Sequence, residues 1–254
     1  MKQIPNILTL ANLFCGALAV IFILQSPGFV ANYNGQDYLV TPPPAMYLAS
    51  LLMGIAAVID FLDGFAARLL KAQSPLGREL DSLADVVTFG VAPGMILYQL
   101  LRSAYMSQPD AMEVSMVNVS IALLLPCFAA YRLAKFNIDD RQKEHFIGMP
   151  TPAVGLLVAS FPLILLYNPY HLADWLQKTW VLYTLLAVLC YLMVCRIPFF
   201  SLKFKSLSWK GNQLRFALLL LSLAGIALLH WAAVPFIFIC YVALSLGKHF
   251  FAPE

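Results

Sequence analysis

The chain has 254 residues, of which 61% are hydrophobic and only 11% are charged. This composition is too apolar for an ordinary soluble domain. The formal net charge is +3 at pH 7, and the sequence has no basic patch interleaved with aromatic residues. Nucleic acid is therefore not an expected partner.

Membrane-crossing helices account for nearly the whole chain. A helix that spans a bilayer needs roughly 20 mostly apolar residues. We therefore expect an all-α polytopic membrane protein, with residues 1–254 forming one domain. Eight segments have the length and composition that a spanning helix requires, at about 7–25, 45–69, 80–103, 114–137, 152–168, 177–196, 213–230 and 232–250.

The placement of basic residues predicts an orientation. If both chain ends are cytoplasmic, only Arg102 and Lys178 of the 16 Lys and Arg fall in outer loops, so that 16 − 2 = 14 follow the positive-inside rule. We expect a protein of the bacterial cytoplasmic membrane, with both termini on the cytoplasmic side.

Four aspartates lie inside the second and third apolar segments. Residues three and four apart share a face of a helix, and a short polar connection makes these two helices antiparallel. We therefore expect two facing stripes near the inner membrane surface. The second segment carries Asp60, Asp63, Gly64, Ala67 and Arg68, and the third carries Gly77, Asp81 and Asp85.

The aspartates predict a divalent metal site. Ionised carboxylates at membrane depth are costly unless a cation or a pathway compensates them. Oxygen ligands without nearby His or Cys favour Mg²⁺, Mn²⁺ or Ca²⁺. Four carboxylates are more than one Mg²⁺ usually takes, and two ions suit phosphoryl transfer. Arg68 could hold phosphate oxygens, and Asp85 could accept a proton from an attacking hydroxyl.

The aspartates allow two other interpretations. Structural ion pairs with Arg68 and Arg78 are one, but two arginines cannot balance four aspartates and Glu79. The other is a divalent-cation channel or transporter with the aspartates as its permeation site. Such a site should recur on several helices near the bilayer midplane, whereas this one occupies a single hairpin.

The spacing Asp60-x2-Asp63-Gly64-x2-Ala67-Arg68-x8-Gly77-x3-Asp81-x3-Asp85 resembles the signature of the CDP-alcohol phosphatidyltransferases. The resemblance implies a homodimeric membrane enzyme, in which CDP-diacylglycerol transfers its phosphatidyl group to an alcohol and releases CMP. It also implies metal ions at the four aspartates and Asp85 as the general base. By the same resemblance, Gly64, Ala67, Arg68 and Gly77 lie against CDP.

Other stretches suggest the acceptor. Residues 4–16, 85–93, 132–137 and 146–153 resemble the membrane-embedded phosphatidylserine synthases of this family, which implies L-serine. A zwitterion needs a cation for its carboxylate and acceptors for its ammonium. Arg132 and Lys135 could supply the cation, and Asn137 could help with the ammonium.

Alternatives remain open for these residues as well. Arg132 and Lys135 also fit a role as anchors for lipid phosphate, and the acceptor could be glycerol-3-phosphate or inositol. Asn6 and Thr9 either cap the first helix or, as the resemblance implies, lie near the nucleotide.

Overall fold

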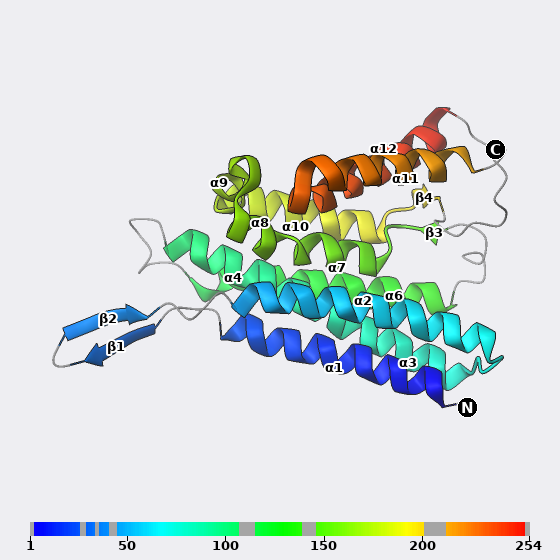
Figure 1. Cartoon of the computed structure of the whole chain (residues 1–254), viewed down its shortest axis with the longest axis horizontal. Helices are drawn as coiled ribbons and strands as arrows, with labels where there is room; N and C mark the ends of the chain where they lie inside the picture. The colour runs from blue at the N-terminus through cyan, green and yellow to red at the C-terminus, as the bar shows by residue number, and fades with distance from the viewer. Residues whose placement is uncertain are drawn as a thin grey trace.

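Helices dominate the computed structural model, which describes residues 3–25, 29–33, 36–40, 45–106, 115–138, 146–200 and 212–251. The long helices run side by side along the long axis of the molecule (Figure 1). The α-helices are α1 (Ile4–Leu24), α2 (Ala45–Leu69), α3 (Pro75–Val86), α4 (Ala92–Met106), α5 (Met116–Ser120), α6 (Leu124–Ile138), α7 (Thr151–Ala159), α8 (Phe161–Tyr167), α9 (Leu172–Leu176), α10 (Thr179–Val194), α11 (Gln213–Leu229) and α12 (Ala233–Phe251).

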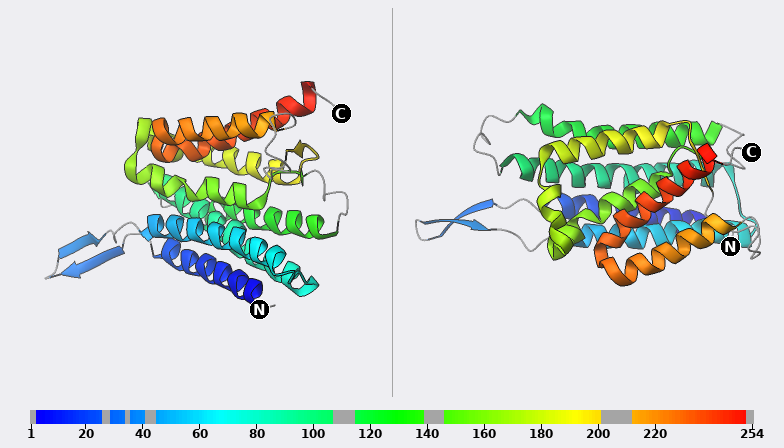
Figure 2. Two further views of the ribbon diagram at one scale, coloured as in Figure 1. Left: turned by 45° about the vertical axis from the view of Figure 1, so that its right-hand side comes forward. Right: turned by 90° about the horizontal axis from the view of Figure 1, so that it is seen from above.

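Short elements join these helices. A π-helical turn, η1 (Val87–Val91), links α3 to α4, and three 3₁₀ turns are η3 (Ile121–Leu123), η5 (Pro169–His171) and η6 (His230–Ala232). Strands β1 (Phe29–Tyr33) and β2 (Gln36–Val40) form an antiparallel hairpin that projects beyond the helices (Figure 2). Strands β3 (Phe146–Ile147) and β4 (Pro198–Phe199) also pair antiparallel.

The prediction of an all-α membrane protein is confirmed, but the count of eight spans is not. Each of the eight predicted segments overlaps one or more helices of the described residues. In the described part of the chain, five helical stretches are long and apolar enough to cross a membrane, and one of them, 213–248, covers both α11 and α12. The stretches Thr151–Tyr167 and Thr179–Val194 are shorter. At about 1.5 Å per residue, 16 or 17 residues do not reach across a hydrocarbon core of about 30 Å.

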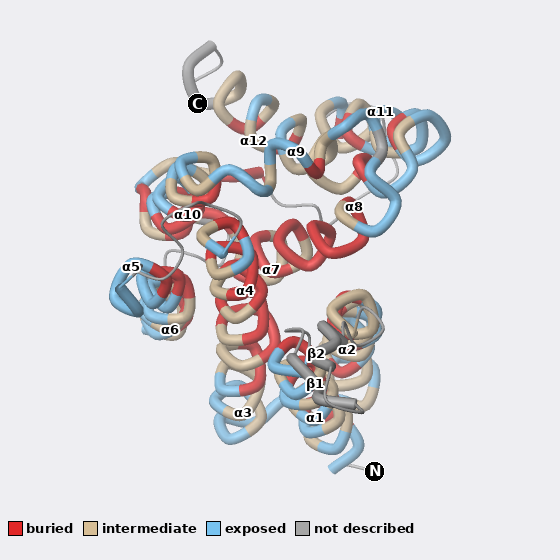
Figure 3. The backbone as a smooth tube through the Cα atoms, turned by 90° about the vertical axis from the view of Figure 1, so that its left-hand side faces the viewer, coloured by how far each residue is buried: buried red, intermediate tan, exposed pale blue. Residues whose placement is uncertain are grey.

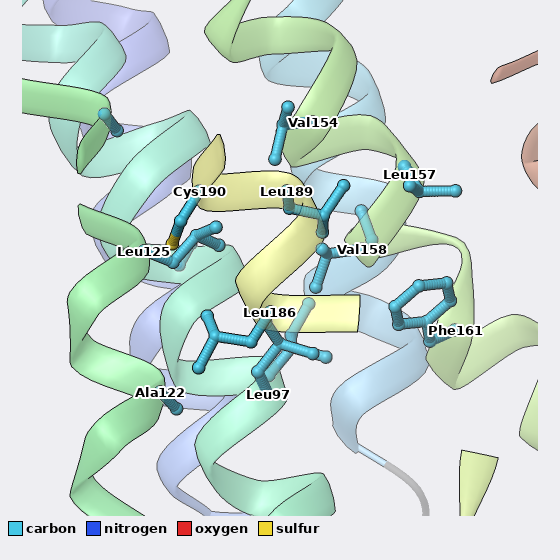
Figure 4. Close-up of a cluster of buried hydrophobic side chains, with 14 of the residues drawn as sticks. Leu97, Ala122, Leu125, Val154, Leu157, Val158, Phe161, Leu186, Leu189 and Cys190 are labelled. Atoms are coloured by element: carbon cyan, nitrogen blue, oxygen red, sulfur yellow. The ribbon is translucent and has the colours of Figure 1, made fainter. Parts of the chain in front are cut away.

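The third segment lies at the centre of the molecule. Its most apolar window is 56% buried, against 22–33% in the other four long stretches. Seen end-on, α4 and α7 form a buried column between α1–α3 on one side and α11–α12 on the other (Figure 3). Leu97, Leu125, Val158 and Leu189 bring α4, α6, α7 and α10 together there (Figure 4).

Glycines allow three helices to approach the η1 turn closely. A Cβ added to Gly155 of α7 would lie 2.9 Å from the Cα of Phe89, and one at Gly90 would lie 3.0 Å from the Cβ of Ala129 on α6. Gly16 of α1 likewise faces Thr88. These contacts fix the backbone directly after Asp85.

Candidate active site

The turn between α2 and α3 fixes where helix α3 starts, and therefore which of its residues face α2. Ser74 caps α3 by accepting a hydrogen bond from the backbone N–H of Gly77 at 3.0 Å, and Pro75 occupies the first turn. Serine at the N-cap followed by proline is a strong helix start. Asp81 and Asp85 therefore face back toward α2, as their spacing predicts.

Three of the four aspartates form a compact cluster. Carboxylate oxygens of Asp60, Asp63 and Asp81 all lie within 4.8 Å of one another, and those of Asp60 and Asp81 are within hydrogen-bonding reach. Asp63 is 5% exposed, whereas Asp60 and Asp81 are half-buried. Asp85 is not in this tight group, but it is buried and interacts electrostatically with all three. The aspartates of the two stripes therefore face each other, as predicted.

The donor set fits a hard divalent cation. The Oδ1 atoms of Asp81 and Asp85 are buried and have no hydrogen-bond partner. Buried polar atoms are rarely left unpaired, and neighbouring carboxylates repel each other at these distances. Oxygen-only ligands suit Mg²⁺ or Mn²⁺.

Thr9 connects α1 to the cluster. Its hydroxyl lies 2.6 Å from Oδ2 of Asp63 and 3.0 Å from the carbonyl of Pro5, and the shorter distance marks Asp63 as the stronger acceptor. The capping interpretation of Asn6 and Thr9 is wrong: Gln3 is the N-cap of α1, and Asn6 donates to the Gln3 side chain. Helix α1 starts earlier than predicted because Pro5 occupies its first turn.

A pocket of about 460 Å³ opens beside the cluster. Its lining includes Asp63 and Asp81 together with five predicted nucleotide residues, Asn6, Thr9, Gly64, Ala67 and Gly77. Sequence reasoning missed the rest of the lining. Five of them lie at unspecified positions inside the signature and one directly precedes Asn6, which is the available signal: Ala72, Gln73, Ser74, Pro75, Arg78 and Pro5.

The small residues keep the pocket open. A Cβ on Gly64 would meet only Nη1 of Arg68, at 3.9 Å, so exposed Arg68 lies beside this wall without lining it. A Cβ on Gly77 would lie 3.2 Å from Oδ1 of Asn6. Side chains at these positions would narrow the space between α1, α2 and α3.

Arg132 approaches the cluster from α6, near Asp85. It is 7% exposed, interacts electrostatically with Asp85, and donates to Oγ1 of Thr151 at 3.3 Å. Its Nε has no hydrogen-bond partner. The other two residues predicted to bind the acceptor alcohol have other neighbours than Arg132 has. Asn137 donates to Oγ of Ser82 at 2.9 Å, and half-buried Lys135 lies near the Cys195 thiol.

Several known proteins are similar in sequence to this chain. A relative from Bacillus subtilis is 37% identical over 175 residues, covering 68% of this chain and 81% of its own length. One from Helicobacter pylori (strain 26695) is 32% identical over 221 residues, covering 86% and 80%. One from Methanocaldococcus jannaschii is 35% identical over 133 residues, covering 52% and 59%. Each bears the name CDP-diacylglycerol–serine O-phosphatidyltransferase.

A model of the CDP-alcohol phosphatidyltransferase family matches residues 2–191. The matched region contains α1, the α2–α3 hairpin with its aspartates and pocket, and Arg132. Because that region covers three-quarters of the sequence and the whole acidic site, the chain belongs to the CDP-alcohol phosphatidyltransferase family.

Proposed function

We propose that this chain transfers the phosphatidyl group of CDP-diacylglycerol to L-serine, giving phosphatidylserine and CMP. The name shared by the relatives supports serine as the acceptor. The observation in the structure that carries the proposal is a buried cation, Arg132, placed beside Asp85 and still holding an unpartnered N–H. A transferase family also favours an enzyme over a cation channel.

The cluster is proposed to hold two Mg²⁺ or Mn²⁺ ions between Asp60, Asp63, Asp81 and Asp85. Enzymes of this family depend on a divalent cation. When bound, such ions neutralise phosphate charge and stabilise the attacking and leaving oxygens of an in-line displacement. Thr9 holds one ligand, Asp63, in place through its hydroxyl.

The pocket on α1, α2 and α3 is proposed to bind the CDP moiety. Asn6, Thr9, Gly64, Ala67 and Gly77 line it, and Arg68 stands at its edge, within reach of a phosphate. Arg78, which the sequence did not predict for this site, is a cation in the lining itself. Small residues would let the nucleotide approach the backbone of both helices.

Serine is proposed to bind between Asp85 and Arg132. The guanidinium is suited to the serine carboxylate, and Lys135 and Asn137 stand on the same helix. Asp85 accepts the proton of the serine hydroxyl while its oxygen attacks the phosphorus that bears diacylglycerol. The new O–P bond forms as the bond to the CMP oxygen breaks, so CMP leaves as the anion.

The protein is proposed to be a single-domain homodimer of the bacterial cytoplasmic membrane, with its site facing the cytoplasm. The α2–α3 turn, the start of α1 and the end of α12 lie at one end of the molecule (Figure 1). The positive-inside rule predicts that this end is cytoplasmic. Homodimerisation is implied by the family resemblance.

An acceptor assay tests the proposal. Purified protein in detergent receives CDP-diacylglycerol with Mg²⁺ or Mn²⁺, and CMP release is recorded with L-serine, glycerol-3-phosphate, inositol or choline. We expect release with serine alone. Release with glycerol-3-phosphate or inositol instead would retain the chemistry and overturn the acceptor.

A further inference from the structure

Two contacts hold the Arg132 guanidinium. Its carbon lies over the ring of Phe136, one turn further along α6, at 5.3 Å from the ring centroid. Its Nη1 donates to Oγ1 of Thr151 on α7 at 3.3 Å. The ring orients the plane of the guanidinium, and a hydrogen bond at one corner limits its rotation within that plane. Together the two contacts leave this buried cation little freedom.

The hydrogen bond to Thr151 leaves one edge of the guanidinium for an anion. Nε of Arg132 is buried and has no hydrogen-bond partner. Because a guanidinium is a rigid planar fork, Nε–H and an N–H of Nη2 point the same way, and such a pair of donors can meet both oxygens of a carboxylate. With Nη1 bonded to Thr151, a carboxylate is directed to the Nε edge.

The start of α7 places the Thr151 hydroxyl. Thr151 is 0% exposed and is the first residue of that helix. The backbone N–H of Gly148 donates to the carbonyl of Ile197 at 3.0 Å, and that of Met149 donates to the carbonyl of Leu192 at 2.8 Å. Gly148 has φ +79°, a conformation that favours glycine. The chain therefore enters α7 along a fixed path.

We propose that Thr151 is a positioning residue for the acceptor site, whose hydroxyl holds Nη1 of Arg132 so that the Nε edge meets the carboxylate of the incoming alcohol. This inference rests on the proposed role of Arg132 in binding serine. In this arrangement Thr151 acts through Arg132 and takes no part in the transfer itself. Its loss should therefore weaken the binding of the acceptor and leave the chemical step in place.

Thr151→Val tests the inference, because it removes the hydroxyl and keeps the branched shape of the side chain. We expect the KM for L-serine to rise about fivefold, with kcat and the KM for CDP-diacylglycerol within about twofold of the wild type. Thr151→Ser retains the hydroxyl and should keep the KM for serine within about twofold. Thr184→Val of α10 is the matched control, since it removes an exposed hydroxyl that bonds the Trp180 carbonyl, and it should leave that KM unchanged.

A double-mutant cycle shows whether Thr151 acts through Arg132. In the Arg132→Lys background, Thr151→Val should change the KM for serine by less than about twofold. An effect of full size in that background would overturn the inference and leave the proposed function standing. So would an unchanged serine KM in Thr151→Val, or a lower unfolding midpoint with the KM of both substrates raised alike. A wild-type protein that releases no CMP with serine would instead remove the proposed function and, with it, the inference.

Discussion

Asp85 combines burial with proximity to both a cation and other carboxylates. It is 7% exposed, faces the cluster and Arg132, and has one oxygen without a hydrogen-bond partner. An aspartate in this position can accept a proton from a hydroxyl bound next to Arg132. The three aspartates of the tight cluster are placed to act as metal ligands, a role that Asp85 shares in the proposed site.

Asp85→Asn should lower kcat for CMP release by at least about a thousandfold, because an amide cannot accept the serine proton. The folded protein should persist, because the amide has nearly the same shape. CMP release and thermal unfolding are the measurements, with exposed Asp174→Asn of α9 as the matched control. Full activity in Asp85→Asn would remove this residue from the mechanism.

Thr9→Val should raise the KM for CDP-diacylglycerol and the Mg²⁺ concentration needed for half-maximal rate, each about tenfold. Valine keeps the shape but leaves buried Asp63 without its 2.6 Å donor, a loss of about 1–3 kcal/mol. Thr9→Ser retains the hydroxyl and should stay close to wild type. Equal behaviour of the two variants would mean that the hydrogen bond does not matter.

At the scale of elements, the close packing around η1 fixes the position of Asp85 along the third segment. A π-helical turn holds an extra residue per turn and often marks a functional site. Here it begins two residues after Asp85, and α1, α6 and α7 pack closely against it at glycine positions. A Cβ at Gly16 or Gly155 would lie under 3.0 Å from the backbone of Thr88 or Phe89, so a side chain there must displace backbone.

Gly155→Ala should lower thermal stability and activity together. The new methyl group would lie 2.9 Å from both Cα and Cβ of Phe89, and overpacking of this kind costs about 1–3 kcal/mol. Gly54→Ala on α2 is the control, since a Cβ there meets nothing within 4 Å. Thermal unfolding in detergent should separate the two variants, and equal midpoints would contradict the close contact.

The positions of the helices could largely be predicted from the sequence, whereas the break within a helical segment and the pairing of the short strands could not. The apolar run at 45–69 coincides with α2 because membrane spans are uniformly apolar over their length. The break between α7 and α8 at Ser160 escaped prediction, although Pro162 cannot donate to the carbonyl four residues earlier, because hydropathy is averaged across it. The β3–β4 pair is only two residues long on each strand, too short for any alternation to appear.

The candidate site, too, could be predicted from the sequence only in part. The acidic stripes could be predicted because helical spacing fixes which residues share a face, and the turn between them is short. The hydrogen bond from Thr9 to Asp63 joins residues 54 positions apart (63 − 9), and no local pattern reports such a contact. Asn137 was expected to face the acceptor, but its amide is bonded to Ser82 of α3.

At the scale of the whole molecule, the metal should stabilise the fold as well as the reaction. Three carboxylates within 4.8 Å repel one another by about 3 kcal/mol per pair at an effective dielectric constant of about 20. EDTA should therefore abolish CMP release and lower the unfolding midpoint, and Mg²⁺ or Mn²⁺ should restore both.

Asp60→Asn provides the control for the charge argument. With one negative charge removed, the difference between the unfolding midpoints in EDTA and in Mg²⁺ should become smaller than in the wild type. A wild-type midpoint that does not respond to EDTA would mean that the cluster does not hold a cation in the folded protein.

The two sides of the acidic cluster come from separate stretches of the polypeptide. The pocket is lined by residues between Pro5 and Asp81, whereas Arg132 contacts Phe136 of α6 and Thr151 of α7. Under the proposed function, mutations in the later stretch should change which alcohol is accepted and leave recognition of the activated lipid unaltered. Exchanging that later stretch between homologues should then change the headgroup of the product without altering the proposed CDP pocket.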